Sequence, residues 1–243
     1  MCFDVDSAPP IPVIRGAAVS HKELTLEAED GNRFAAFAAA PEEQASVGVV
    51  ILPDVRGLYH FYEELALRFA ERGMAAIAFD YFGRTAGVQK RGDDFEYMPH
   101  VEQTTPEGVR ADVAAAIAYL RGRRVRSIFT VGFCMGGRYS WVAAADQEGL
   151  AGAVGFYGRP ASAIERAADI KAPILALQAG DDKNITAEDN EAFEAALRDA
   201  GVEHELVTYE GAPHSFFDRK QEEFQAASDD AWSRTLAFIE ANS

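Results

Sequence analysis

A β-branched, apolar stretch at residues 127–131 leads directly into Gly132-Phe133-Cys134-Met135-Gly136-Gly137, and helix-forming residues follow. When a strand turns this sharply into a helix, the central residue of the turn is pushed out at the end of the sheet. A side chain two positions before or after that residue would collide with the backbone, so glycine is needed at both places. The pattern therefore predicts a nucleophile elbow with Cys134 at its tip, near helix N–H groups that favour a thiolate.

Strands and helices alternate along the chain, which predicts an α/β fold. Such alternation indicates a mostly parallel central sheet with helices on both faces. The turn Asp30-Gly31-Asn32 separates two further strands and predicts an N-terminal antiparallel hairpin. The expected strands are 21–28, 33–39, 47–52, 74–79, 127–131, 151–156, 174–179 and 204–209. The expected helices are a segment through Phe69 that ends at Gly73, residues 106–121, the elbow to about 145, 187–200 and about 218–241.

The chain divides into a tail and one domain. Residues 1–20 contain three prolines and are predicted to form an irregular tail, which leaves residues 21–243 as a single domain. Residues 85–103 form a long, polar segment without the spacing of apolar residues that marks a helix or strand. They follow a strand, so we expect them to lie at the ligand-binding edge of the sheet as a lid loop.

Composition excludes several classes of protein. Lys and Arg total 23 against 39 Asp and Glu, and the formal net charge is −16. This speaks against nucleic-acid binding, which requires neutralised phosphates, and against binding to an anionic membrane surface. No apolar run reaches the ~18 residues that span a bilayer, and the first residues lack the features of a signal peptide.

The two cysteines favour a reduced, cytoplasmic protein. Cys2 lies in the predicted tail and Cys134 in a core turn, so we expect no disulfide between them. No His-x-x-His or Cys-x-x-Cys spacing is present, and no metal site is expected.

A cysteine nucleophile needs a base and a group that orients the base. After Cys134, one predicted strand ends at Asp181-Asp182 and a later one at a Gly/Pro-containing turn that carries His214. This is the order nucleophile, acid, histidine, with each residue just past a strand. Asp181 and Asp182 compete for the acid role, and Asp182 is favoured. Each part also has a plainer interpretation: a tight turn around a small residue, a helix-capping aspartate, or a surface histidine.

With these motifs and Pro213-His214-Ser215-Phe216, the chain resembles the dienelactone hydrolase family from about residue 20 to its C-terminus. The resemblance implies an α/β-hydrolase fold, a triad of Cys134, His214 and Asp182, and no cofactor. It also implies a small-molecule lactone or ester that is hydrolysed by way of a thioester, and an anionic substrate where this carries a carboxylate, as dienelactones do.

The resemblance implies further site residues. Asp54 stands where studied family members carry a glutamate that takes part in activating the thiol, and Val55 would supply one oxyanion-hole N–H. The elbow geometry itself already implies the other, that of Met135.

Substrate binding follows the family pattern less closely. Arg84 matches one arginine that grips the substrate carboxylate. The second is expected four residues after the histidine, where this chain has Asp218, with Arg219 next. This departure weakens the assignment to dienelactones more than the assignment to hydrolysis. A non-catalytic ligand-binding protein and a redox thiol enzyme remain alternatives, although the latter lacks a nearby resolving cysteine.

Overall fold

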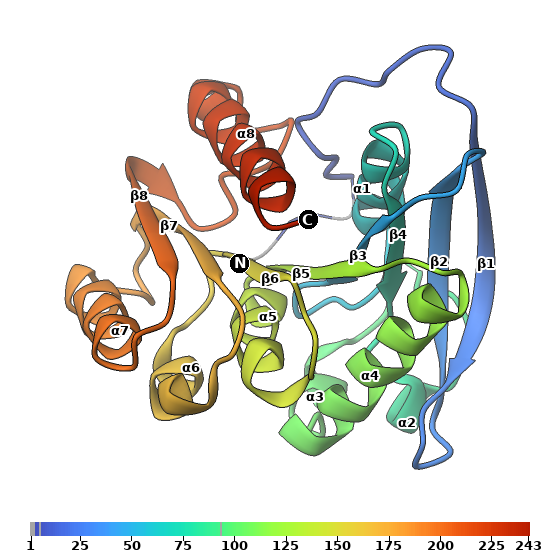
Figure 1. The fold of residues 1–243 in the computed structure, drawn as a ribbon, viewed down its shortest axis with the longest axis horizontal. Coiled ribbons are helices and arrows are strands. Elements are labelled where there is room, and N and C mark those ends of the chain that lie inside the picture. The colour runs from blue at the N-terminus through green and yellow to red at the C-terminus, as the bar shows by residue number, and fades with distance from the viewer. Residues whose placement is uncertain (1–2, 5, 93) are drawn as a thin grey trace.

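The computed structural model describes residues 3–4, 6–92 and 94–243, so Cys2 lies outside the described residues (Figure 1). Eight strands form one sheet in the order β1-β2-β4-β3-β5-β6-β7-β8. The first two pairings, β1 with β2 and β2 with β4, are antiparallel, and the other five are parallel. The strands are β1 Val19–Glu27, β2 Arg33–Pro41, β3 Val47–Leu52, β4 Ala75–Phe79, β5 Ser127–Phe133, β6 Gly152–Phe156, β7 Ile174–Asp181 and β8 His204–Pro213. The predicted parallel sheet with an N-terminal hairpin is confirmed.

Helices cover both faces of the sheet (Figure 1). One face carries α1 (His60–Ala70) and α8 (Gln225–Ala241). The other carries α4 (Pro106–Gly122), α5 (Met135–Asp146), α6 (Ala161–Glu165) and α7 (Ala187–Asp199). The apolar residues accordingly form two clusters of buried side chains, one against each face. The short elements are α2 (Gly83–Ala86), α3 (Met98–Val101) and the 3-10 turns Ala167–Asp169 and Glu222–Phe224.

The last helix begins later than the sequence predicted. It starts at Gln225 rather than near Asp218. Asp218 is 5% exposed, and its carboxylate accepts hydrogen bonds from Ser7 Oγ at 2.6 Å and from the Ala8 N–H at 3.3 Å. Residues far away in sequence thus hold Asp218 in a loop. The strand before it is also longer than expected, because β8 pairs with β7 past an irregularity as far as Pro213.

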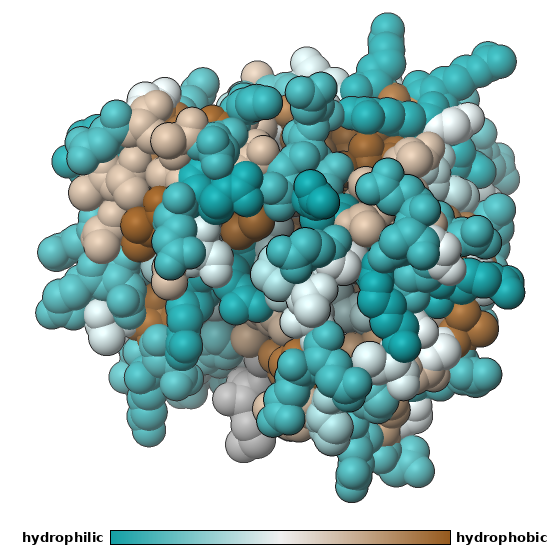
Figure 2. Space-filling model, turned by 90° about the horizontal axis from the view of Figure 1, so that it is seen from below, coloured by the Kyte–Doolittle hydropathy of each residue, from teal (hydrophilic) through white to brown (hydrophobic). Residues whose placement is uncertain are grey.

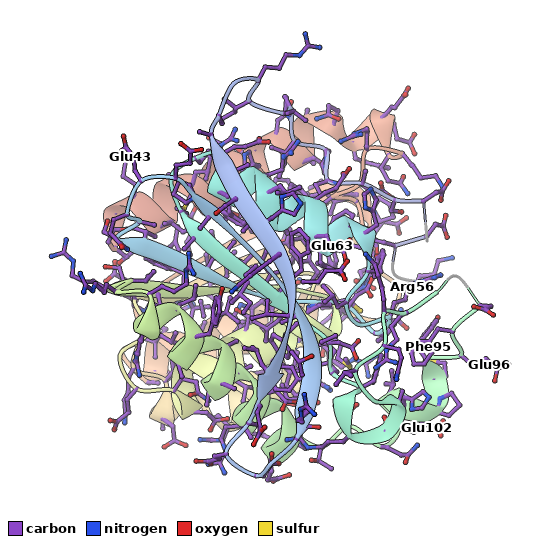
Figure 3. The ribbon with its side chains drawn as sticks, turned by 90° about the vertical axis from the view of Figure 1, so that its right-hand side faces the viewer. Glu43, Arg56, Glu63, Phe95, Glu96 and Glu102 are labelled. Atoms are coloured by element: carbon purple, nitrogen blue, oxygen red, sulfur yellow. The ribbon has the colours of Figure 1, made fainter. Side chains whose placement is uncertain are left out.

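The segment 85–103 lies at the end of the sheet where the parallel strands finish. Figure 3 shows Phe95, Glu96 and Glu102 of this segment at the same end of the molecule as Arg56, which follows β3. Glu43, which precedes β3, lies at the opposite end. The Arg56 guanidinium stacks 5.5 Å from the ring centroid of Tyr97. A lid would lie at this location, and closure of the segment over the site remains a prediction.

The surface over α4 to α6 is mostly hydrophilic, with apolar residues in small scattered patches (Figure 2). Among the described residues, no helix has the length and apolar character needed to cross a bilayer.

Candidate active site

Cys134 stands between β5 and α5 with φ 55° and ψ −112°, a conformation that side chains rarely adopt. The flanking glycines allow it. A Cβ on Gly132 would lie 1.9 Å from the Gly136 carbonyl oxygen, and one on Gly136 would lie 2.0 Å from the Leu52 carbonyl oxygen. Cys134 is the N-cap residue of α5, which places it at the positive end of the helix dipole.

His214 follows β8 and meets both partners that the sequence analysis assigned to it. Its Nδ1–H donates to Asp182 Oδ2 at 2.5 Å, and its ring also hydrogen-bonds the Cys134 side chain. Asp182 is held in turn by the Asn184 N–H at 2.8 Å. Asp181 is exposed to solvent, so Asp182 is the carboxylate positioned beside the histidine.

The charges of these groups depend on one another. Burial alone would lower the pKa of His214, but its hydrogen bonds to Asp182 and Cys134 raise that pKa to about 9. Burial would raise the pKa of Asp182, whereas the hydrogen bond from His214 holds it below its usual value of 3.8. At neutral pH the geometry therefore favours an imidazolium beside the Asp182 carboxylate.

Unusual backbone conformations gather around this site. Within the described part of the chain, four non-glycine residues have positive φ, and three of them are Cys134, Tyr157 (36°) and Ser215 (66°). The Tyr157 ring lies 4.9 Å from the His214 ring. Such conformations persist only where the surrounding structure enforces them, and they concentrate at functional sites.

Asp54, in the loop after β3, is fully buried near Cys134. Its Oδ1 accepts the Arg56 N–H at 2.8 Å, its Oδ2 accepts the Tyr59 hydroxyl at 3.3 Å, and the Phe3 N–H donates to the same carboxylate. Burial raises the pKa of Asp54 to about 7, and the nearby Cys134 charge adds to the effect. This carboxyl can exchange a proton near neutral pH.

A cavity of about 300 Å³ opens over the cysteine. Met135 and Val55 both line it, and the Met135 N–H, at the first position of α5, has no intrahelical acceptor. Val101 of α3 also reaches the cavity, so the segment 85–103 contributes to its wall. The lining residues are Val55, Val101, Cys134, Met135, Arg138, Tyr157, Arg159, Asn184, Ile185 and His214.

Arg84 lies outside the cavity wall, and its role in substrate binding stays a prediction that this position does not favour. Its guanidinium pairs with Asp112 at 2.5 Å and with Asp30 at 2.6 Å. Asp112 is 1% exposed, so this arginine neutralises a buried carboxylate. Arg219 is also engaged elsewhere, since it donates to the Pro9 carbonyl at 3.1 Å.

Sequence reasoning missed two arginines that do line the cavity. Arg138 lies in the first turn of α5, stacked 4.5 Å from the Tyr139 ring centroid. Its Nε atom is buried and has no hydrogen-bond partner among the described residues. Arg159 follows β6 and is exposed. The available signal was position: Arg138 stands one helical turn after Cys134, and Arg159 follows the neighbouring strand.

Comparison with known proteins agrees with this geometry. The profile of the dienelactone hydrolase family matches residues 34–243. The chain belongs to the dienelactone hydrolase family. It is therefore a hydrolase, and a small-molecule lactone or ester is the substrate class consistent with that family.

Two curated relatives in this family match most of the chain. A Yersinia pestis protein, provisionally named a carboxymethylenebutenolidase, is 28% identical over 229 residues, which cover 88% of this chain and 85% of that protein. An Escherichia coli K12 protein with the same provisional name is 29% identical, with coverage of 86% and 83%.

Solved structures of similar proteins share the fold. One from Klebsiella pneumoniae, provisionally described as a dienelactone hydrolase, has a TM-score of 0.80 at 24% identity and covers 92% of this chain and 99% of that one. The Pyrococcus furiosus esterase Pf2001 has a TM-score of 0.70 at 15% identity, with coverage of 91% and 92%.

Proposed function

We propose that this member of the dienelactone hydrolase family cleaves a lactone or carboxylic ester through a thioester on Cys134. The observation that carries the proposal is the continuous chain of contacts from Cys134 to His214 to Asp182, at an elbow that opens into a cavity. A nucleophile, a base and an orienting carboxylate are the parts that acyl transfer requires.

Acylation begins when the Cys134 thiolate attacks the substrate carbonyl carbon. The developing oxyanion accepts hydrogen bonds from the backbone N–H groups of Met135 and Val55. The carbon–oxygen bond then breaks, and the imidazolium of His214 gives its proton to the leaving oxygen. In a lactone the leaving alcohol stays tethered to the acyl group.

Deacylation uses the same residues in reverse. Neutral His214 takes a proton from water, the resulting hydroxide attacks the thioester carbon, and the carbon–sulfur bond breaks. The carboxylic acid leaves and the Cys134 thiolate returns. Asp182 stabilises the imidazolium in both halves, and Asp54, with its pKa near 7, accepts the thiol proton when the cysteine is neutral.

Arg138 and Arg159 support an anionic substrate. Unlike Arg84, neither forms an ion pair with a carboxylate of the described residues, and both border the cavity that contains Cys134. A carboxylate on the substrate would complement the charges of both arginines.

The cysteine mechanism is tested with an activated aryl ester. We expect Cys134→Ala to abolish turnover without changing the fold, while the matched variant Cys2→Ala keeps full activity. Mass spectrometry of the wild type, quenched during turnover, should show the acyl mass on the peptide that contains Cys134. Full turnover in Cys134→Ala would reject the mechanism, and so would an adduct on any other residue.

The anionic preference is tested by pairing a carboxylate-bearing ester with its neutral analogue. A charge-assisted hydrogen bond contributes about 1.5–3 kcal/mol, so Arg138→Ala or Arg159→Ala should lower kcat/KM for the anionic ester about 10- to 100-fold and leave the neutral ester within a few-fold. Arg84→Ala, assayed well below its unfolding temperature, serves as the control and should not alter this ratio. An equal loss on both esters would contradict the assignment.

A further inference from the structure

Described residues near the N-terminus contact two loops of the active site. We call these residues, 3–4 and 6–11, the strap. None of them lies in a helix or strand, yet Phe3 is 2% and Ile11 2% exposed. An irregular segment that is this well buried must have its position fixed by specific contacts.

The first set of contacts is at Asp54. The Phe3 N–H donates to the Asp54 carboxylate. The Phe3 ring stacks on Phe61 with 4.0 Å between centroids and meets the Tyr157 ring edge-on at 6.3 Å. Tyr157 in turn contacts the His214 ring. Phe3 therefore binds Asp54 through its backbone N–H, and its ring supports the aromatic wall behind the histidine.

The second set is at the loop that carries His214. Ser7 is fully buried, and its Oγ donates to Asp218 Oδ2 at 2.6 Å while accepting the Asp4 N–H at 2.9 Å. The Arg219 N–H donates to the Ala8 carbonyl at 2.9 Å. Asp218 stands four residues after His214, so the strap fixes the loop just beyond the histidine.

We propose that the strap is a positioning element for catalysis, with Phe3 setting Asp54 and Ser7 setting the His214 loop. The proposal rests on the proposed function of Cys134. The strap contributes no residue to the wall of the substrate cavity, so its loss should lower kcat and leave KM nearly unchanged. A contact that only stabilised the fold would leave both constants unchanged in the folded enzyme.

The pH profile gives a second, independent readout. Phe3→Leu keeps the N–H that donates to Asp54 and removes only the ring packed on Phe61, so the looser packing should relieve the burial of the carboxyl and move the acid limb of kcat to lower pH. Other groups face Asp54 and stay in place in this variant, so they do not produce the shift. They are Arg56 and Tyr59 from the loop before α1, Tyr62 from α1, Tyr81 after β4 and Cys134 at the start of α5.

The experiment compares Ser7→Ala, Phe3→Leu and the control Lys220→Ala. Lys220 pairs with Asp4 and Asp6 of the same strap, but these pairs are exposed. All variants are assayed with the activated aryl ester across pH 5–10, well below their measured unfolding temperatures. We expect Ser7→Ala and Phe3→Leu to lower kcat at least tenfold with KM within threefold. The acid limb of Phe3→Leu should move down by at least half a pH unit, and Lys220→Ala should match the wild type.

Each remaining outcome overturns the proposal. Folded variants with wild-type kcat and pH profile would show that the strap only stabilises the protein. Variants that cannot fold would show the same, because the strap would then be a folding determinant. The proposed function fails separately: Cys134→Ala would keep turnover, whatever the strap variants do.

Discussion

At the scale of single residues, Asp54 combines its proposed chemical use with a cost in stability. Its carboxyl is fully buried and keeps its proton to about pH 7, whereas an unfolded chain releases that proton near 3.8. A raised carboxyl pKa favours the folded state at low pH, and that advantage is lost as the pH rises from about 4 to about 7. Above pH 7 the folded protein holds a buried charge.

Asp54→Asn should therefore stabilise the protein and impair catalysis. At about 1.4 kcal/mol per pKa unit, the gain in the free energy of unfolding at pH 8 is at most about 4 kcal/mol, and it becomes small near pH 4. Urea unfolding at both pH values measures the gain, and the aryl ester assay measures the loss of kcat. An equal gain in the free energy of unfolding at the two pH values would contradict the claim that Asp54 is a buried charge above pH 7.

Residues differ in how far the sequence could predict them. Cys134, Asp182 and His214 were identifiable because each follows a strand and is marked by local glycine, proline or paired aspartate. The ion pairs of Arg84 were not predicted, because its partners, Asp30 and Asp112, lie 54 and 28 positions away and carry no local signal. The burial of Phe3 and Ser7 could not be predicted from the sequence either, since only tertiary contacts create it.

At the scale of elements, the turn between β5 and α5 is fixed by close backbone approach. The site of an added Cβ at Gly136 lies 2.0 Å from the Leu52 carbonyl oxygen and 2.4 Å from that of Pro53, and neither backbone oxygen can move without shifting β3. The end of β3, just before Asp54, and the helix that begins after Cys134 are thus packed against each other through this glycine.

Gly136→Ala should disrupt this packing. We expect the free energy of unfolding to fall by about 3 kcal/mol or more, as for other overpacked interiors, together with loss of activity. Gly122→Ala is the matched control, because no atom lies within 4 Å of its added Cβ, and helix propensity should leave it neutral or slightly stabilised. Unfolding in guanidinium measures the free energy of unfolding of both variants. Equal values for Gly136→Ala and Gly122→Ala would contradict the packing argument.

The sequence predicts most elements well because apolar runs and helical spacing are local. It fails at the start of α8, where residues 218–224 have helical composition but Asp218 is held in a loop by Ser7. Tertiary contacts override local propensity at that point.

At the scale of the whole molecule, two arginines near the cysteine oppose a net charge of −16. The Debye length is ~30 Å at 0.01 M salt and ~8 Å at 0.15 M. An anionic substrate at low salt therefore experiences repulsion from the entire protein, whereas at moderate salt only the nearby Arg138 and Arg159 act on it.

The preference for an anionic ester over its neutral analogue should consequently rise between 0.01 M and 0.15 M salt. The measurement is the ratio of the two kcat/KM values, taken in sodium chloride at constant pH. If salt only screened the ion pair between the substrate and the two arginines, this ratio would fall as salt rises. A fall from the lowest salt upward would therefore show that repulsion by the net charge of the whole protein is unimportant.

The contact between Ser7 and Asp218 also bears on when the enzyme becomes active. The two residues are 211 positions apart, so a ribosome that has just added the first must add 211 more residues before the contact can form. At about 5–20 residues per second this delay is roughly 10–40 s. A nascent chain cannot lock its histidine loop during that time, and hydrolysis cannot begin before Asp218 has been added.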